Sequence, residues 1–180
     1  MTEKPVQSSL SVENDFGGSM PTSVEFVQNG IERGAERIDL AFHAGSEWLM
    51  IDDKLAVISE IVRRKIRCRI LINSEASVSN IIPHMRSENK MYVGLTQTEK
   101  NWRDFQARYS DFIELRVSEI PLLHAVYHVK GVQESAVRIG YYTYDNAWMK
   151  KNYISVFPQK SPYYDLYAQE FSYLWEQAHE

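Results

Sequence analysis

Apolar positions along the chain follow the period of a helix in some stretches and that of a strand in others. In the first half these patterns alternate, over residues 22–35, 37–45, 52–65 and 66–73. Thr22 or Ser23 can cap the first helix, and Gly34 marks the approach to its end. The order helix, strand, helix, strand is typical of a parallel sheet covered by helices.

The second half of the sequence is richer in strands. A helical pattern at 98–111 is followed by four strand patterns, over residues 112–119, 123–130, 135–144 and 152–158. The short connections between these strands predict antiparallel hairpins. A closing helix at 161–180 can start at Ser161 and Pro162, and its aromatic residues fall on one face.

The remaining stretches set the limits of the domain. Residues 74–97 mix turn residues with short apolar pieces, which we interpret as a loop with a short helix near 81–86. Residues 1–21 are rich in Ser, Gly and acidic residues, as is typical of a flexible leader. A chain of 180 residues suits one core. We therefore expect a single α/β domain over 22–180, with a mixed β-sheet flanked by helices.

Composition narrows the classes of protein that fit. The 20 Lys and Arg against 24 Asp and Glu give a net charge of -4, which provides no overall attraction to nucleic acid. No apolar run approaches the length of a membrane span and no secretory signal is visible, so we expect a cytoplasmic protein without a membrane partner. The single cysteine, Cys68, excludes an internal disulfide, and its apolar neighbours predict a buried thiol. We expect no metal and no other cofactor.

Candidate chemistry centres on the strand at 123–130, which contains a His-x-Lys sequence. Alternation places His124, His128 and Lys130 on one face of this strand. An imidazole beside an ammonium can serve phosphate chemistry, because the histidine can attack phosphorus while the lysine neutralises the developing charge. The alternative is a solvated strand face whose polar residues have no such role.

The sequence around this strand resembles the phospholipase D-like superfamily. The half-motif of that family has His-x-Lys, an acidic residue in the following turn and a Gly-Ser-x-Asn strand. His128 and Lys130 match its first part, and Glu134 lies in the turn. The segment 140–144, GYYTY, stands in the place of the glycine strand. The first two helix-strand units and the aromatic closing helix are also similar to those domains.

The resemblance implies which residues form a phosphate site, and two replacements in that site bear on hydrolysis. The implied catalytic residues are His128, Lys130 and Glu134, and the implied ligand contacts on the glycine strand are Gly140, Tyr141 and Thr143. Tyr141 replaces the family's serine and Thr143 replaces its asparagine, two groups that help to orient phosphate. The chain is also similar to a branch that serves as a sensor-like domain in bacterial regulators, where the nucleophile motif is commonly eroded. We therefore expect weak or lost hydrolysis.

Two histidines and a basic run complete the candidates. His43 follows a strand of the parallel half, at the end where ligands of such sheets bind, so it is either a pocket residue or a structural histidine. His124 shares the face of His128 and is a candidate ligand contact. The run 63–69, RRKIRCR, could contact nucleic acid, but strand alternation and the helix end disperse its charges. Nucleic acid is thus a possible but not a favoured partner.

Three functions are compatible with these features. The first is a domain that binds a phosphate-bearing small molecule, such as a nucleotide or phosphate ester, with little or no hydrolysis. The second is a homodimeric phosphodiesterase or nuclease, in which two chains each contribute His128 and Lys130, one histidine as nucleophile and the other as general acid. The third is a protein-interaction module on the same fold. We favour the first, and we expect a homodimer.

Overall fold

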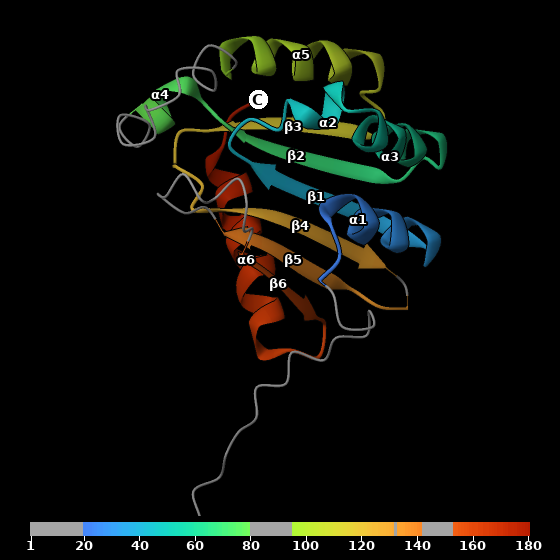
Figure 1. Ribbon diagram of the computed structural model, residues 1–180. Helices are drawn as coiled ribbons and strands as arrows, with labels where there is room; N and C mark the ends of the chain where they lie inside the picture. The colour runs from blue at the N-terminus through green and yellow to red at the C-terminus, as the bar shows by residue number, and fades with distance from the viewer. Residues whose placement is uncertain (1–19, 80–94, 132, 142–152) are drawn as a thin grey trace, which may run out of the picture.

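The chain folds around a mixed sheet of six strands with helices on both faces (Figure 1). The computed structural model describes residues 20–79, 95–131, 133–141 and 153–180. The strands are β1 Ala35–Phe42, β2 Arg67–Asn73, β3 Ile113–Ser118, β4 His124–Gly131, β5 Ala136–Tyr141 and β6 Tyr153–Pro158. They lie in the order β3-β2-β1-β4-β5-β6, with β1, β2 and β3 parallel and β4, β5 and β6 joined by antiparallel pairing. The expected α/β class with a mixed sheet is confirmed.

The helices form two unequal layers. Their bounds are α1 Ser23–Glu32, α2 Glu47–Met50, α3 Asp52–Arg63, α4 Glu75–Ser79, α5 Leu95–Arg108 and α6 Pro162–Gln177. Of the described helices, α1, α2, α3 and α5 cover one face of the sheet, and α6 crosses the opposite face (Figure 1). None of these described helices is long and apolar enough to cross a membrane.

Local sequence explains where α1 and α6 begin. The Thr22 hydroxyl accepts a hydrogen bond from the Glu25 N–H at 3.2 Å, and the Glu25 carboxylate accepts one from the Thr22 N–H at 2.8 Å. This reciprocal pair is a capping box. Ser161 caps α6 by accepting a hydrogen bond from the Tyr163 N–H, and Pro162 takes the first helical position. Both helix starts confirm the prediction.

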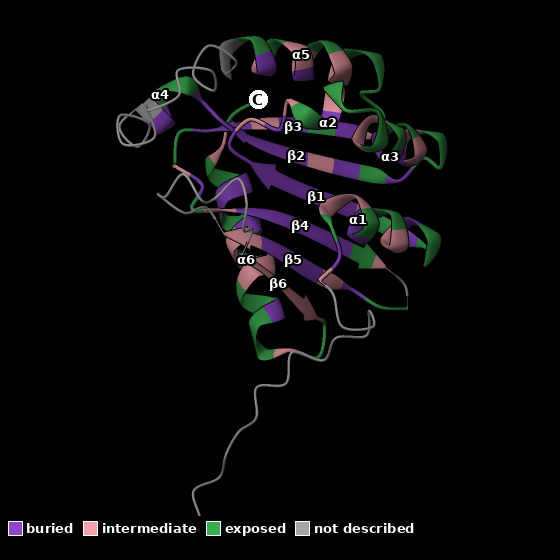
Figure 2. Cartoon of the chain, in the orientation of Figure 1, coloured by how far each residue is buried: buried purple, intermediate pink, exposed green. Residues whose placement is uncertain are grey.

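Alternation along the strands divides the core into two apolar layers. The larger layer packs beneath α1, α2, α3 and α5 and includes Ile38, Leu40, Ile70, Trp48 and Trp102. The smaller layer packs beneath α6 and includes Val126, Ile139, Phe171 and Trp175. Figure 2 shows that β1 and β2 are buried along most of their length. In β4, Val126 belongs to the α6 layer and Tyr127 to the other, so the predicted alternation is confirmed.

The strand order corrects the prediction of consecutive hairpins. Strand β3 lies at one edge of the sheet, parallel to β2, and does not pair with β4. The connection 119–123 instead carries the chain past the carboxyl ends of β2 and β1 to the start of β4. Ala35 also begins β1 instead of ending the helix, since Gly34 turns the chain with φ of 85°. The predicted helix near 81–86 lies outside the described residues, and the four-residue α2 was not predicted.

Candidate functional site

His128 lies inside the protein, between the sheet and α6. Its side chain projects from β4 and only 4% of the residue is exposed. Nδ1 is 3.1 Å from Oδ2 of Asp39 on β1, and Nε2 is 2.9 Å from the hydroxyl of Tyr164 on α6. With Asp39 ionised, Nδ1–H donates to the carboxylate, and Nε2 is within hydrogen-bond distance of the tyrosine hydroxyl. Both nitrogens are therefore bonded within the fold.

Asp39 is the centre of this buried polar network. Arg69 on β2 donates to it twice, at 2.8 and 2.9 Å, and Arg37 lies 3.1 Å away. Burial alone would raise the pKa of Asp39, but hydrogen bonds from Arg69 and His128 and the charges of Arg69 and Arg37 together lower it below its usual value. The carboxylate therefore stays ionised in the interior, where it fixes the orientation of the His128 ring.

Aromatic residues of α6 cover Arg69 of this network and Arg116 on β3. The Arg69 guanidinium lies 4.9 Å from the ring centre of Phe171 and 5.1 Å from that of Trp175. Arg116 on β3 lies 4.9 Å from the Trp175 ring and donates to the Trp175 carbonyl at 2.8 Å. Cation–π contact and hydrogen bonding thus hold α6 against the sheet. No substrate can reach His128 in this arrangement unless α6 moves.

Lys130 has a different environment from His128, although both project toward the α6 side. Lys130 is exposed, and it pairs in register with Arg37 on β1, which pairs in register with Arg67 on β2. We call Arg67, Arg37 and Lys130 the basic row. Within the described residues, neither Lys130 nor Arg67 forms an ion pair. Like charges side by side on a sheet repel, and of the three cations only Arg37 has a described carboxylate, that of Asp39, within ion-pair distance, so the row carries net positive charge.

The third implied catalytic residue, Glu134, faces away from this pair. Its carboxylate accepts a hydrogen bond from Arg33 at 3.1 Å, and both side chains are about half exposed. Among the described residues, Glu134 forms no hydrogen bond or ion pair with His128 or Lys130. The structure therefore does not assemble His128, Lys130 and Glu134 into one group.

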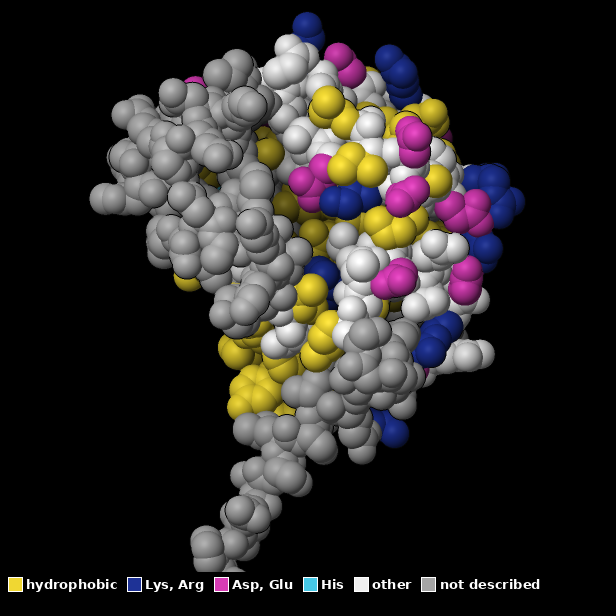
Figure 3. All heavy atoms as spheres, in the orientation of Figure 1, with side chains coloured by type: hydrophobic (Ala, Val, Ile, Leu, Met, Phe, Trp, Pro, Cys, Tyr) yellow, Lys and Arg dark blue, Asp and Glu magenta, His cyan; other side chains and the backbone are white. Residues whose placement is uncertain are grey.

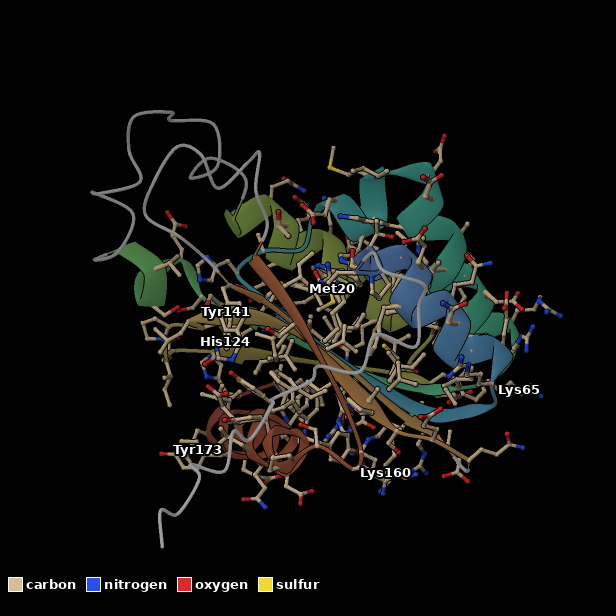
Figure 4. All side chains as sticks on the ribbon, turned by 60° about the horizontal axis from the view of Figure 1, so that its bottom comes forward. Met20, Lys65, His124, Tyr141, Lys160 and Tyr173 are labelled. Carbon is tan, nitrogen blue, oxygen red and sulfur yellow. The ribbon has the colours of Figure 1, made fainter. Side chains whose placement is uncertain are left out.

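His124 and Tyr141 do meet, at the opposite end of the sheet from the basic row. They are register partners on β4 and β5, with ring centres 6.1 Å apart. His124 Nε2 is 3.1 Å from Glu170, and the Tyr141 hydroxyl is 3.1 Å from that of Tyr167 on α6. Figure 4 shows His124 and Tyr141 together at this end, far from Lys65 and Lys160. At Tyr141, where the sequence resemblance would place a serine, the chain thus has a ring packed against α6.

His43 and Asn73 tie down the connection that crosses the carboxyl ends of the parallel strands. His43 Nε2 lies 2.6 Å from the Leu122 carbonyl, and burial lowers the pKa of its ring. The Asn73 amide donates to Ile120 at 2.9 Å and accepts from the Leu122 N–H at 3.1 Å. The contacts of His43 that the structure describes are those of a structural histidine. Asn73 was missed as a partner, although an asparagine ending a buried strand is a visible signal.

The other implied ligand residues fall outside this cluster. Gly140 projects toward the α1 side of the sheet, where a Cβ would lie 3.8 Å from Nη1 of Arg138. Thr143 lies outside the described residues. Across the part of the chain that the structure describes, no group of three or more His, Cys, Asp or Glu side chains could hold a metal ion.

Sequence reasoning missed the partners that define the environment of His128. Asp39, Arg69 and Tyr164 come from three elements, and Asp39 is separated from His128 by 89 positions. The available signal was a charged residue inside each apolar strand, in IDLAF and in CRILI. A charge in a buried strand requires a partner, but the pattern alone does not say which one.

Comparison with known proteins does not show a family for this chain. No protein-family model and no curated protein matches the chain. Among solved structures, it is similar to TrmBL2, described as an archaeal chromatin protein with a novel mode of DNA binding, with 15% identity and a TM-score of 0.48. The match covers 87% of this chain and 49% of the other, so the chain spans about half the length of that structure.

Proposed function

We propose that the chain is a phospholipase D-like domain that binds a phosphate-bearing small molecule at the basic row and does not hydrolyse it efficiently. The observation that supports this proposal is that the two motif residues, His128 and Lys130, have different environments. His128 is enclosed and bonded through both nitrogens, whereas Lys130 is exposed. Binding by cations can operate without a free histidine, but covalent catalysis by His128 cannot.

Charge and spacing favour a phosphate ester as the ligand class. Neighbouring strands are about 4.8 Å apart, so the three cations span roughly 10 Å. That width suits one phosphate ester or a diphosphate. Arginine can bind two phosphate oxygens through its planar fork, and lysine adds a point charge. Arg37 also contacts Asp39, which links the row to the buried network.

A binding assay on the full chain tests the proposal, with ADP and inorganic pyrophosphate as probes. Lys130→Ala should weaken binding about tenfold, the value of one charge-assisted contact. The control is Lys100→Ala, which removes another exposed lysine, on α5 at the other face of the sheet, and should leave affinity unchanged. Raised salt should weaken binding, because the contacts are exposed.

Other outcomes would assign a different function. Turnover of a generic phosphodiester that depends on His128, with the chain purified as a dimer, would support the homodimeric phosphodiesterase or nuclease. If the wild-type chain binds neither ADP nor pyrophosphate, the protein-interaction module becomes the favoured function. Binding of a single-stranded oligonucleotide with a steep salt dependence would favour nucleic acid as the partner.

A further inference from the structure

Arg138 is a buried arginine on the face of the sheet that carries α1, opposite the face with His128. Only 5% of the residue is exposed. It projects from β5 on the side opposite α6, and its guanidinium lies 5.0 Å from the ring centre of Tyr127. Nε of Arg138 donates to the Pro21 carbonyl at 3.0 Å. Pro21 follows Met20, so this hydrogen bond joins the segment before α1 to Arg138. Figure 4 places Met20 on this side of the sheet.

No described carboxylate provides a counter-charge for the rest of the Arg138 guanidinium. Among the described residues, neither Nη1 nor Nη2 has a hydrogen-bond acceptor, and no carboxylate lies within ion-pair distance. Burial lowers the pKa of Arg138, while Tyr127 acts in the opposite direction. Arginine nevertheless keeps its charge in proteins, and a buried charge without a partner is strongly unfavourable.

A glycine and two aliphatic residues flank Arg138 on β5 and β6. Its neighbour on β6 is Val156, and two positions along β5 the glycine Gly140 pairs with Ile154. Because Gly140 has no side chain, the space 3.8 Å from Nη1 where a Cβ would lie is unfilled by that residue. In Figure 1, α1 lies over β1 and β4, and no described helix lies over β5 and β6 on this face. Figure 3 views this face and shows hydrophobic side chains between the basic and acidic ones.

We infer that Arg138 is the base of a second binding site, independent of the basic row, that takes a small organic oxyanion. The guanidinium fork would bind the carboxylate or phosphate oxygens through Nη1 and Nη2. Ile154 and Val156 would contact an apolar body attached to the anion. This combination of an apolar lining with one convergent charged group is typical of small-molecule sites.

Thermal unfolding of the full chain tests the inference, with benzoate as the probe and neutral benzamide as its matched control at constant ionic strength. Benzoate at about ten times its Kd should raise Tm by roughly 3–6 °C, and benzamide should not. Inorganic phosphate serves as a parallel probe and tells whether the oxyanion preferred is carboxylate or phosphate. Lys130→Ala should keep the benzoate response, which separates this site from the basic row.

Two substitutions address the site itself. Arg138→Met should abolish the response, and without ligand this variant should be at least as stable as wild type, because a buried charge without a partner has been removed. Gly140→Val keeps the charge but fills the space beside Nη1, and it should also abolish the response. If Arg138→Met does not fold, the benzoate response of Gly140→Val still tests the site.

Three results would overturn the inference. One is the absence of a benzoate or phosphate shift in wild type. Another is an equal shift in Gly140→Val. The third is destabilisation of unliganded Arg138→Met that is reproduced by Glu13→Gln or Asp15→Asn, since the counter-charge would then come from the chain itself.

Discussion

Replacing Asp39 with asparagine tests whether the buried network is held together by charge. The substitution keeps the shape of the side chain but removes the charge that faces Arg69, whose side chain is only 14% exposed. Breaking a buried ion pair by removing one partner costs about 3–5 kcal/mol. Part of this cost is offset, because Arg69 remains partly exposed to water and contacts the aromatic rings of α6. We therefore expect Asp39→Asn to lower the free energy of unfolding by about 3 kcal/mol at pH 7.

The effect should depend on pH in a defined direction. The pKa of Asp39 is lower in the folded state than its ordinary value of 3.8. Ionised Asp39 therefore contributes its full stabilisation at pH values above 3.8, and this is lost as pH falls toward the folded-state pKa. The difference between wild type and Asp39→Asn should be constant above pH 5 and shrink below about pH 4. Other carboxylates titrate in both proteins, so they cancel in the difference.

Urea unfolding followed by tryptophan fluorescence measures this difference. Two substitutions calibrate it. Glu134→Gln breaks an exposed ion pair and should cost less than about 1 kcal/mol, and Tyr164→Phe removes one hydrogen bond to His128 and should cost about 1 kcal/mol. The reasoning is refuted if Asp39→Asn costs no more than Glu134→Gln, or if its cost at pH 3 equals that at pH 7. The m-value should be the same in every variant.

Three further predictions concern the fold. Gly45→Ala should destabilise the protein by several kcal/mol in urea unfolding, because the added Cβ would lie 1.9 Å from the Phe42 ring. Gly34→Ala is the control: Gly34 also has a positive φ but has open space around it, so this change should cost only about 1 kcal/mol. Burial raises the pKa of Cys68, so a thiol-reactive dye should label the native protein far more slowly than the unfolded one; equal rates would contradict the buried position. Asn73→Ala should cost about 1–3 kcal/mol by calorimetry, since it leaves the Leu122 N–H unpaired and removes one of the two hydrogen bonds to the Ile120 carbonyl; an unchanged Tm would contradict its structural role.

The parts of the fold that the sequence predicts are those that local physics determines. The start of α6 follows from Ser161 and Pro162, and the face of each β4 residue follows from the two-residue period of a strand. Both depend on neighbours within a few positions. The burial of Cys68 follows in the same way from the apolar residues around it.

The order of the strands and the environment of the candidate site depend on residues far apart in the sequence. Consecutive strands usually lie side by side, so β3 and β4 were expected to pair, but β3 joins β2 instead. Likewise, alternation identifies the face of His128 but not what covers it. That face is covered because Tyr164 and its neighbours on α6 lie across it, and only the tertiary structure shows that Asp39 meets the ring.

The late position of α6 in the chain has a consequence for folding. Strands β1, β2 and β4 precede α6, so the face that carries Asp39, Arg69 and His128 is uncovered until residues 162–177 have been synthesised and docked. An exposed apolar sheet face at that stage would favour aggregation. Ionised side chains in its centre keep the uncovered face hydrated, and they become buried only when the aromatic residues of α6 arrive. The same groups that orient His128 in the native state therefore protect the incomplete chain from self-association.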